Sequence, residues 1–137
     1  MLKILNELNL SEVTFPSNTI CYVLHVNKPQ YAKRKEHIIK TMSAHNIPFE
    51  WIYDGNQEDI SDKVLKSLFK KPFLESSPEV SCCYKHYLAW KSFLSTDKTY
   101  ALILEDDVFL APDFVAMFNR SITELSQYKD TVSIQYS

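Results

Sequence analysis

Apolar and polar residues follow two different spacings along the chain. Four segments carry the short apolar or alternating pattern of strands: residues 19–26 (TICYVLHV), 47–53 (IPFEWIY), 100–104 (YALIL) and 131–136 (TVSIQY). In the second of them, Phe49, Trp51 and Tyr53 fall on one face, because successive side chains of a strand point to opposite sides. Asp54 and Gly55 follow directly, and this pair is typical of a turn that ends a strand.

The segments between the predicted strands repeat their apolar residues every three or four positions, which is the spacing of one helix face. They predict helices over residues 29–46, 60–69 and 81–95, and a last helix from Pro112 onward. The expected inward positions are Ile38, Ile39 and Met42 in the first helix, Cys83, Tyr87, Trp90 and Leu94 in the third, and Phe114, Val115, Phe118, Ile122 and Leu125 in the last.

Strands that alternate with helices predict an α/β fold with a mostly parallel sheet and helices on both faces. We expect residues 1–18 to be a polar lead-in and residues 19–137 to form a single domain. Ligands of such sheets bind beyond the carboxyl ends of the strands. The loop after Val26, the turn at Asp54 and the acidic cluster Glu105-Asp106-Asp107 should all lie at that edge.

Composition narrows the classes of protein. Of the 137 residues 45% are apolar and the formal net charge is −2, which favours a packed globular protein and gives no basic arm for nucleic acid. No segment reaches the roughly 18 consecutive apolar residues of a membrane span, and the N-terminus lacks the pattern of a signal peptide. We therefore expect a cytoplasmic protein. The three cysteines have neither a disulfide-framework pattern nor a familiar zinc spacing.

The single glycine, Gly55, excludes the glycine-rich loops that usually bind nucleotide phosphates. A bound nucleotide would need another means of holding its phosphates, and a divalent cation is the obvious one. Three consecutive carboxylates at Glu105, Asp106 and Asp107 would repel one another unless a cation neutralised them. At a strand end, Glu105 and Asp107 should point to one side and Asp106 to the other.

Two other interpretations of the acidic cluster remain open at this stage. One is a solvated acidic turn without a ligand. The other is a metal-dependent phosphohydrolase, although phosphatases of the DxDxT type carry their carboxylates after the first strand, whereas this cluster follows a late one.

Residues 101–108 (ALILEDDV) closely resemble the LILEDDV signature of glycosyltransferase family 25. That family includes bacterial lipooligosaccharide galactosyltransferases and procollagen galactosyltransferases. The resemblance begins at about Tyr22 and includes Asp54-Gly55 at the end of the second strand. Between that turn and the acidic cluster the family has a Glu, then Gly-Cys, then Ser-His, and then a Trp. The corresponding residues here are Glu79, Ser81-Cys82, Lys85-His86 and Trp90. Lys85 replaces the usual serine and Ser81 the usual glycine.

The resemblance implies a GT-A-like fold and transfer of a hexose, with galactose expected, from a UDP-sugar donor to a lipooligosaccharide or related surface glycan. It implies a divalent cation, typically Mn²⁺, that bridges the diphosphate, with Asp107 and Glu105 as the metal residues. Glu105 would also bind the donor, through its ribose or a metal-bound water, and Asp106 would orient the sugar or the groups around the metal ligands. Further donor-binding candidates are His86, Glu79, His25, Asn27, Arg34 and Asp54. Glu79 is equally a candidate for stabilising the helix N-terminus, His86 for a half-buried structural histidine, and Arg34 for a solvated charge.

The resemblance names no catalytic base in this chain. Family members normally continue well beyond the acidic cluster, so we expect a chain truncated at its C-terminus. An inactive remnant, or a UDP-sugar-binding module with the same fold, is therefore the alternative to an active transferase. A glycolipid acceptor would bring at most peripheral contact with the inner face of a membrane.

Overall fold

A computed structural model of the chain describes residues 13–70 and 75–128. The elements in chain order are β1 (Thr19–Leu24), the 3-10 helix η1 (Pro29–Tyr31), α2 (Ala32–Ala44), β2 (Glu50–Ile52), the 3-10 helix η2 (Gln57–Asp59), α3 (Asp62–Leu68), α4 (Pro78–Leu94), β3 (Tyr100–Glu105) and α5 (Phe114–Leu125). The strand expected at residues 131–136 lies outside the described residues.

The chain divides into two compact units, one of residues 17–109 and one of residues 1–16 together with 110–137. The first unit holds the sheet, in the order β2-β1-β3, with both strand pairs parallel. Val23 is paired with Trp51 of β2, and Tyr22 with Ile103 of β3. The predicted α/β class with a parallel sheet is confirmed, while the GT-A-like assignment stays a prediction.

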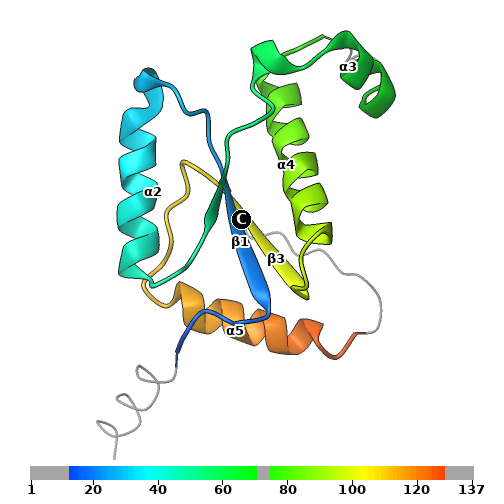
Figure 1. The fold of residues 1–137 in the computed structure, drawn as a ribbon. Coiled ribbons are helices and arrows are strands. Elements are labelled where there is room, and N and C mark those ends of the chain that lie inside the picture. The colour runs from blue at the N-terminus through cyan, green and yellow to red at the C-terminus, as the bar shows by residue number, and fades with distance from the viewer. Residues whose placement is uncertain (1–12, 71–74, 129–137) are drawn as a thin grey trace, which may run out of the picture. The chain divides into compact units, whose positions relative to one another are not determined.

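Helices lie on both sides of this sheet, as expected (Figure 1). On one face Tyr22, Leu24 and Ile52 form a core cluster with Ala89 of α4. On the other face the Lys35 ammonium of α2 lies 5.9 Å from the centre of the Trp51 ring. Each strand therefore divides its side chains between a face toward α4 and a face toward α2.

The aromatic face predicted for the second strand is confirmed, since the Trp51 ring contacts both Phe49 and Tyr53. The strand itself is shorter than expected, at Glu50–Ile52. The first predicted helix is a 3-10 turn followed by α2, which ends at Ala44. Asn46 follows with a φ of 53°, a left-handed conformation that asparagine tolerates well and that stops a helix.

The inward face predicted for residues 81–95 is wrong. Cys83 is exposed, and Trp90 and Leu94 are 57% and 80% exposed. The buried positions of α4 are Val80, Ser81, Lys85 and Ala89. Small or nominally polar side chains let the helix approach the sheet closely, so its buried face carries no apolar stripe. In α2, Ile38 and Met42 are buried as predicted, but Ile39 is 49% exposed.

Helix α4 also begins earlier than predicted, at Pro78. The Ser77 hydroxyl accepts a hydrogen bond from the backbone N–H of Val80 at 3.2 Å, which satisfies one of the free donors of the first turn. Pro78 suits the first helical position because its missing N–H would have no partner there. These local signals set the start of α4 at Pro78.

The other unit is described for residues 13–16 and 110–128. Within it, Val115 and Phe118 of α5 are buried as predicted, and Phe118 stacks on Phe15 with ring centres 5.5 Å apart. The Asn119 amide donates a hydrogen bond to the carbonyl of Thr14. Residues far apart in sequence therefore hold this unit together.

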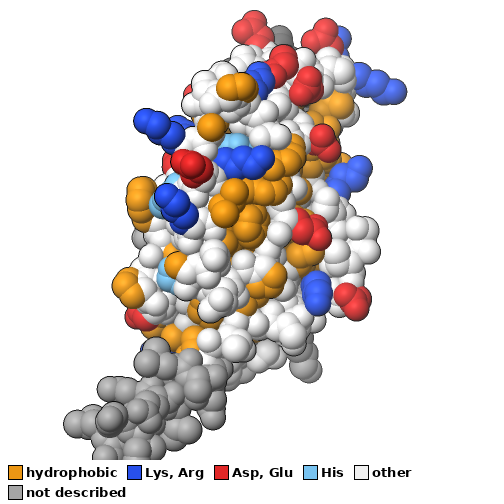
Figure 2. Space-filling model, turned by 60° about the vertical axis from the view of Figure 1, so that its left-hand side comes forward, with side chains coloured by type: hydrophobic (Ala, Val, Ile, Leu, Met, Phe, Trp, Pro, Cys, Tyr) orange, Lys and Arg blue, Asp and Glu red, His pale blue; other side chains and the backbone are white. Residues whose placement is uncertain are grey.

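The described helices can be compared with a membrane span, and one face of the molecule shows how the charges are distributed. None of the described helices is long and apolar enough to cross a bilayer. On the face drawn in Figure 2, basic and acidic side chains of the described residues are interspersed.

Candidate functional site at the carboxyl edge of the sheet

A cleft of about 500 Å³ opens at the carboxyl edge of the sheet, within the unit of residues 17–109. Among the residues that line it are His25, Arg34, Cys82, Lys85, Glu105, Asp106 and Asp107. They come from the ends of β1 and β3, from α2 and from the first turns of α4. The loop after the first strand and the acidic cluster therefore meet in one cleft, at the edge where α/β sheets bind ligands.

Asp106 is held on the side of the cleft toward α2. Its Oδ2 lies 2.8 Å from Nδ1 of His25, and its Oδ1 accepts a hydrogen bond from Nη1 of Arg34 at 3.3 Å. The Asp106 and His25 residues are 8% and 2% exposed. The His25 ring lies between Asp106 and the aromatic rings of Trp51 and Tyr53. Asp106 is thus engaged through both oxygens before any ligand enters.

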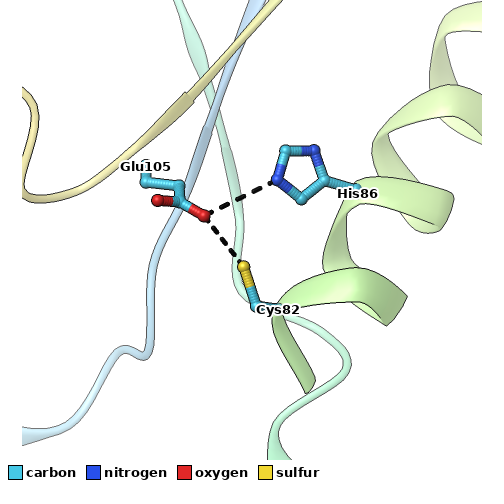
Figure 3. A group of neighbouring side chains, drawn as sticks. All are labelled: Cys82, His86 and Glu105. Carbon is cyan, nitrogen blue, oxygen red and sulfur yellow. Dashed lines mark hydrogen bonds and ion pairs between the residues drawn. The ribbon is translucent and has the colours of Figure 1, made fainter. Parts of the chain in front are cut away.

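Glu105 faces the opposite way, toward α4. The Cys82 thiol donates a hydrogen bond to Oε1 of Glu105 at 2.9 Å, and Nε2 of His86 lies 3.7 Å from the same oxygen (Figure 3). The Glu105 side chain is half exposed, at 52%. The expected division of Glu105 and Asp106 between two sides is therefore present in the structure.

Asp107 lines the cleft and is exposed. Within the described ranges, no side chain forms a hydrogen bond or an ion pair with its carboxylate. Asp107 and Glu105 are therefore the carboxylates of the cluster that remain accessible to a ligand. Both oxygens of Asp106 are already occupied by side chains.

Three predicted donor-binding residues lie elsewhere among the described residues. Glu79 is exposed in the first turn of α4, where its negative charge stabilises the positive end of the helix dipole. The capping hydrogen bond comes from Ser77 instead. Asn27 accepts a hydrogen bond from the Lys35 ammonium at an exposed position. Asp54 lines a separate cleft on the α4 side of β2. None of the three is among the residues that line the cleft at the acidic cluster, and neither is His86, which lies beside Glu105.

Lys85 is the residue whose importance the sequence did not reveal. It is 3% exposed, and its ammonium donates to the carbonyl oxygens of His25, Tyr53 and Asp54 at 3.3, 2.9 and 2.9 Å. An ammonium has three N–H donors and no acceptor, so Lys85 is fully used in joining α4 to the ends of β1 and β2. Burial lowers the pKa of Lys85, and nearby acidic groups, with Asp54 first, oppose this effect.

Gly55 is required where α4 passes the turn after β2. Its φ is +86°, and an added Cβ would lie 2.8 Å from Cδ1 of Tyr84. The Ser81 hydroxyl donates a hydrogen bond to the Gly55 carbonyl at 2.7 Å. A glycine therefore permits both the left-handed backbone and the close approach of the helix.

Cys82 was also missed, although it stands four residues before His86 on the same helix. Burial, followed by the hydrogen bond and negative charge of Glu105, raises the pKa of the Cys82 thiol from 9.0 to about 12. A helix places residues four apart on one face, so this spacing was a signal available in the sequence.

The accessible groups suit a hard divalent cation bound together with a nucleotide. Such ions prefer carboxylate oxygens and commonly take only one or two from the protein, with substrate phosphates and water completing their shell. Glu105 and Asp107 supply these oxygens at the cleft. Asp106 does not fit the role, because both its oxygens already have partners.

Known proteins match this region of the chain. The sequence profile of glycosyltransferase family 25, described as an LPS biosynthesis protein family, matches residues 21–136. A lipooligosaccharide biosynthesis protein, lic2B of Haemophilus influenzae, is 35% identical over 83 residues, which are 57% of this chain and 30% of the relative. No solved structure gives a significant match.

Two further relatives also match only part of their own length. A putative glycosyltransferase of Haemophilus influenzae strain Rd is 32% identical over 94 residues, 65% of this chain and 32% of the relative. The lacto-N-neotetraose biosynthesis glycosyltransferase LgtB of Neisseria meningitidis serogroup B is 32% identical over 84 residues, 58% of this chain and 30% of the relative. The aligned segments thus cover about a third of each relative. Because the family profile covers most of the sequence, the chain belongs to glycosyltransferase family 25.

Proposed function

We propose that the chain binds a UDP-sugar and transfers its hexose, galactose, to a lipooligosaccharide or a related surface glycan. One observation carries the proposal: in a family 25 chain, the accessible carboxylates Glu105 and Asp107 line a cleft at the carboxyl edge of a parallel sheet. The names of two relatives, a lipooligosaccharide biosynthesis protein and a lacto-N-neotetraose biosynthesis glycosyltransferase, support the choice of acceptor. This arrangement is also what a GT-A-like fold would provide.

Arg34 is the residue best suited to bind the diphosphate. Its guanidinium donates through Nη1 to Asp106, and its side chain is 53% exposed at the cleft. A guanidinium has five N–H donors in a planar fork, so donors remain for phosphate oxygens after one is used. Asp106 would then orient Arg34 and would reach the sugar only indirectly.

Glu105 and Asp107 would hold the divalent cation, with Mn²⁺ as the ion we propose. When bound, such an ion neutralises the charge that develops on the departing UDP. Lys85 is not free to share that work, because three carbonyl oxygens already occupy its ammonium. Its part is to fix α4, and with it Cys82 and His86, against the strands that end at the cleft.

His86 lies next to Glu105 on the α4 side, with its side chain 33% exposed. From there we propose that its ring hydrogen-bonds the donor or orients Glu105 by a charge interaction. We assign no catalytic base, because each of these carboxylates and histidines already has a binding or structural role at the cleft.

Thermal unfolding with UDP and Mn²⁺ tests the binding part of the proposal. A ligand at a hundred times its dissociation constant stabilises the native state by about 2.7 kcal/mol, so the melting temperature should rise. Asp107→Ala should abolish most of the rise, while Asp97→Ala, at an exposed aspartate remote from the cleft lining, should keep it. An unchanged rise in Asp107→Ala would refute the metal assignment.

Turnover separates the three functions that share this binding site. With UDP-galactose and lipooligosaccharide, a transferase releases UDP and extends the glycan. A binding module shows the thermal shift and releases nothing. A metal-dependent phosphohydrolase splits the diphosphate of the donor into UMP and galactose 1-phosphate without any acceptor. The proposal predicts UDP release that requires the acceptor.

A further inference from the structure

Cys82, His86 and Glu105 form a donor set chemically different from the two carboxylates assigned above. Sγ of Cys82 lies 2.9 Å from Oε1 of Glu105, and Nε2 of His86 lies 3.7 Å from the same oxygen. The three donor atoms all lie within 4.8 Å of one another. In Figure 3 the two side chains from α4 and the carboxylate from β3 converge on one point.

Secondary structure fixes this convergence from both sides. Cys82 and His86 are four residues apart on α4, so their side chains lie one above the other on one face. Glu105 is the last residue of β3 and points toward the same helix. The bonds of Ser81 and Lys85 tie this part of α4 to the strand ends, so the gap between the donors is set by packed backbone.

We propose that Cys82, His86 and Glu105 bind a Zn²⁺ ion through Sγ, Nε2 and a carboxylate oxygen. Tetrahedral zinc with bonds of about 2.0–2.3 Å puts neighbouring ligand atoms roughly 3.3–3.5 Å apart. The two separations to Glu105, 2.9 and 3.7 Å, lie on either side of this range, and Sγ lies within 4.8 Å of Nε2, so side-chain rotations would have to bring the three atoms to zinc distances. Three protein ligands leave the fourth position open to water or another small ligand.

The donor types select the metal. Thiolate and imidazole favour Zn²⁺ over Mn²⁺, and Zn²⁺ also binds more tightly in the general order of divalent ions. On binding, the Cys82 S–H bond breaks, its proton passes to solvent, and a zinc–sulfur bond forms without any change of oxidation state. All three side chains are partly or fully exposed, so an ion has access.

The zinc site does not depend on transferase activity. It shares Glu105 with the proposed Mn²⁺ site, so the two ions would compete for that carboxylate. The test below measures metal binding alone, and its failure would leave the UDP and Mn²⁺ proposal untouched.

Cobalt(II) is a spectroscopic probe for this site, because it occupies zinc sites and a bound thiolate gives it a charge-transfer band in the near ultraviolet. Metal-free protein titrated with Co²⁺ should develop this band with one equivalent, and added Zn²⁺ should abolish it. Cys83→Ser should retain the band, since Cys83 is exposed and outside the donor group. Cys82→Ser should lose it while keeping the same circular dichroism.

Glu105→Gln and His86→Ala keep the thiol, so they test the site even if Cys82→Ser fails to fold. Each should weaken Zn²⁺ binding, measured by competition with a chromophoric chelator, by at least about tenfold. The proposal is overturned if the wild type shows no stoichiometric cobalt band, if Cys83→Ser loses the band and Cys82→Ser keeps it, or if neither Glu105→Gln nor His86→Ala changes the zinc affinity.

Discussion

The two walls of the cleft use neighbouring carboxylates for opposite purposes. On the α2 side, Asp106 is 8% exposed and both its oxygens are bound by His25 and Arg34. On the α4 side, the Glu105 side chain is 52% exposed, and among the described residues its carboxylate has polar contacts with Cys82 and His86. On one wall both carboxylate oxygens are already bound by side chains, and on the other the carboxylate is exposed to an entering ligand.

This difference follows from strand geometry. Successive side chains at the end of β3 point to opposite faces of the sheet, so Glu105 meets α4 and Asp106 meets the side of α2. A buried carboxylate must be paired, because burial without a partner costs several kcal/mol. Asp106 therefore stabilises the fold, while Glu105 and Asp107 stay available for binding.

The largest expected difference between the two walls is in stability, and it is measured by removing each carboxylate in turn. Asp106→Ala leaves the buried His25 ring and the Arg34 guanidinium without their acceptor, so the free energy of unfolding should fall by about 3 kcal/mol. Asp107→Ala, at an exposed neighbour, should change it by less than about 0.5 kcal/mol. Urea denaturation of both variants measures the difference, and equal losses would mean that Asp106 has no special structural role.

Lys85 joins the two walls, so its replacement should have the next largest effect. Lys85→Met keeps most of the side-chain volume but leaves three carbonyl oxygens without their donor. Because unpaired buried acceptors are costly, the free energy of unfolding should fall by about 2 kcal/mol. The matched control is Lys91→Met at an exposed position of the same helix, and its loss should be under about 0.5 kcal/mol. If Lys85→Met is as stable as the control, Lys85 does not hold α4 against the strand ends.

The smallest expected effect is a change in the reactivity of the Cys82 thiol on the α4 wall. The pKa of Cys82 is raised to about 12, first by burial and then by Glu105, so little thiolate exists at pH 8 and alkylation by iodoacetamide should be slow. Glu105→Gln removes the negative charge that helps to raise this pKa. The pKa should therefore fall, and the thiolate fraction at pH 8 should rise tenfold for each unit of that fall.

Tandem mass spectrometry of metal-free protein distinguishes alkylation at Cys82 from alkylation at its neighbour. Cys83 is exposed and serves as the internal control, with a rate that Glu105→Gln should leave nearly unchanged. If Cys82 reacts equally fast with and without the carboxylate, Glu105 does not contact the thiol in solution.

The sequence predicted the three described strands, the parallel α/β class and the meeting of the acidic cluster with the loop after β1. Those features depend on short-range periodicity and on general rules of sheet topology. It also separated Glu105 from Asp106 correctly, because strand alternation is a local property. The family resemblance at residues 101–108 was confirmed by the match over residues 21–136.

What the sequence could not predict depended on partners distant along the chain. Lys85 looks like a surface charge until the carbonyls of His25 and Tyr53 are brought to its ammonium. The apolar spacing of Trp90 and Leu94 favoured the wrong face of α4, since the true contact face depends on small residues such as Ala89. The partners of Asp106 likewise come from elements 72 and 81 residues away.

Calorimetric titration of UDP in the presence of Mn²⁺ and the absence of Zn²⁺ tests the division of roles most directly. Wild-type protein should bind UDP, and Glu105→Gln should bind it at least about tenfold more weakly, a loss of about 1.4 kcal/mol in binding free energy. The free energy of unfolding of the unliganded variant should stay within about 0.5 kcal/mol of the wild type. Equal UDP affinity in the two proteins would contradict the claim that the open carboxylates of this cleft hold the cation and the nucleotide.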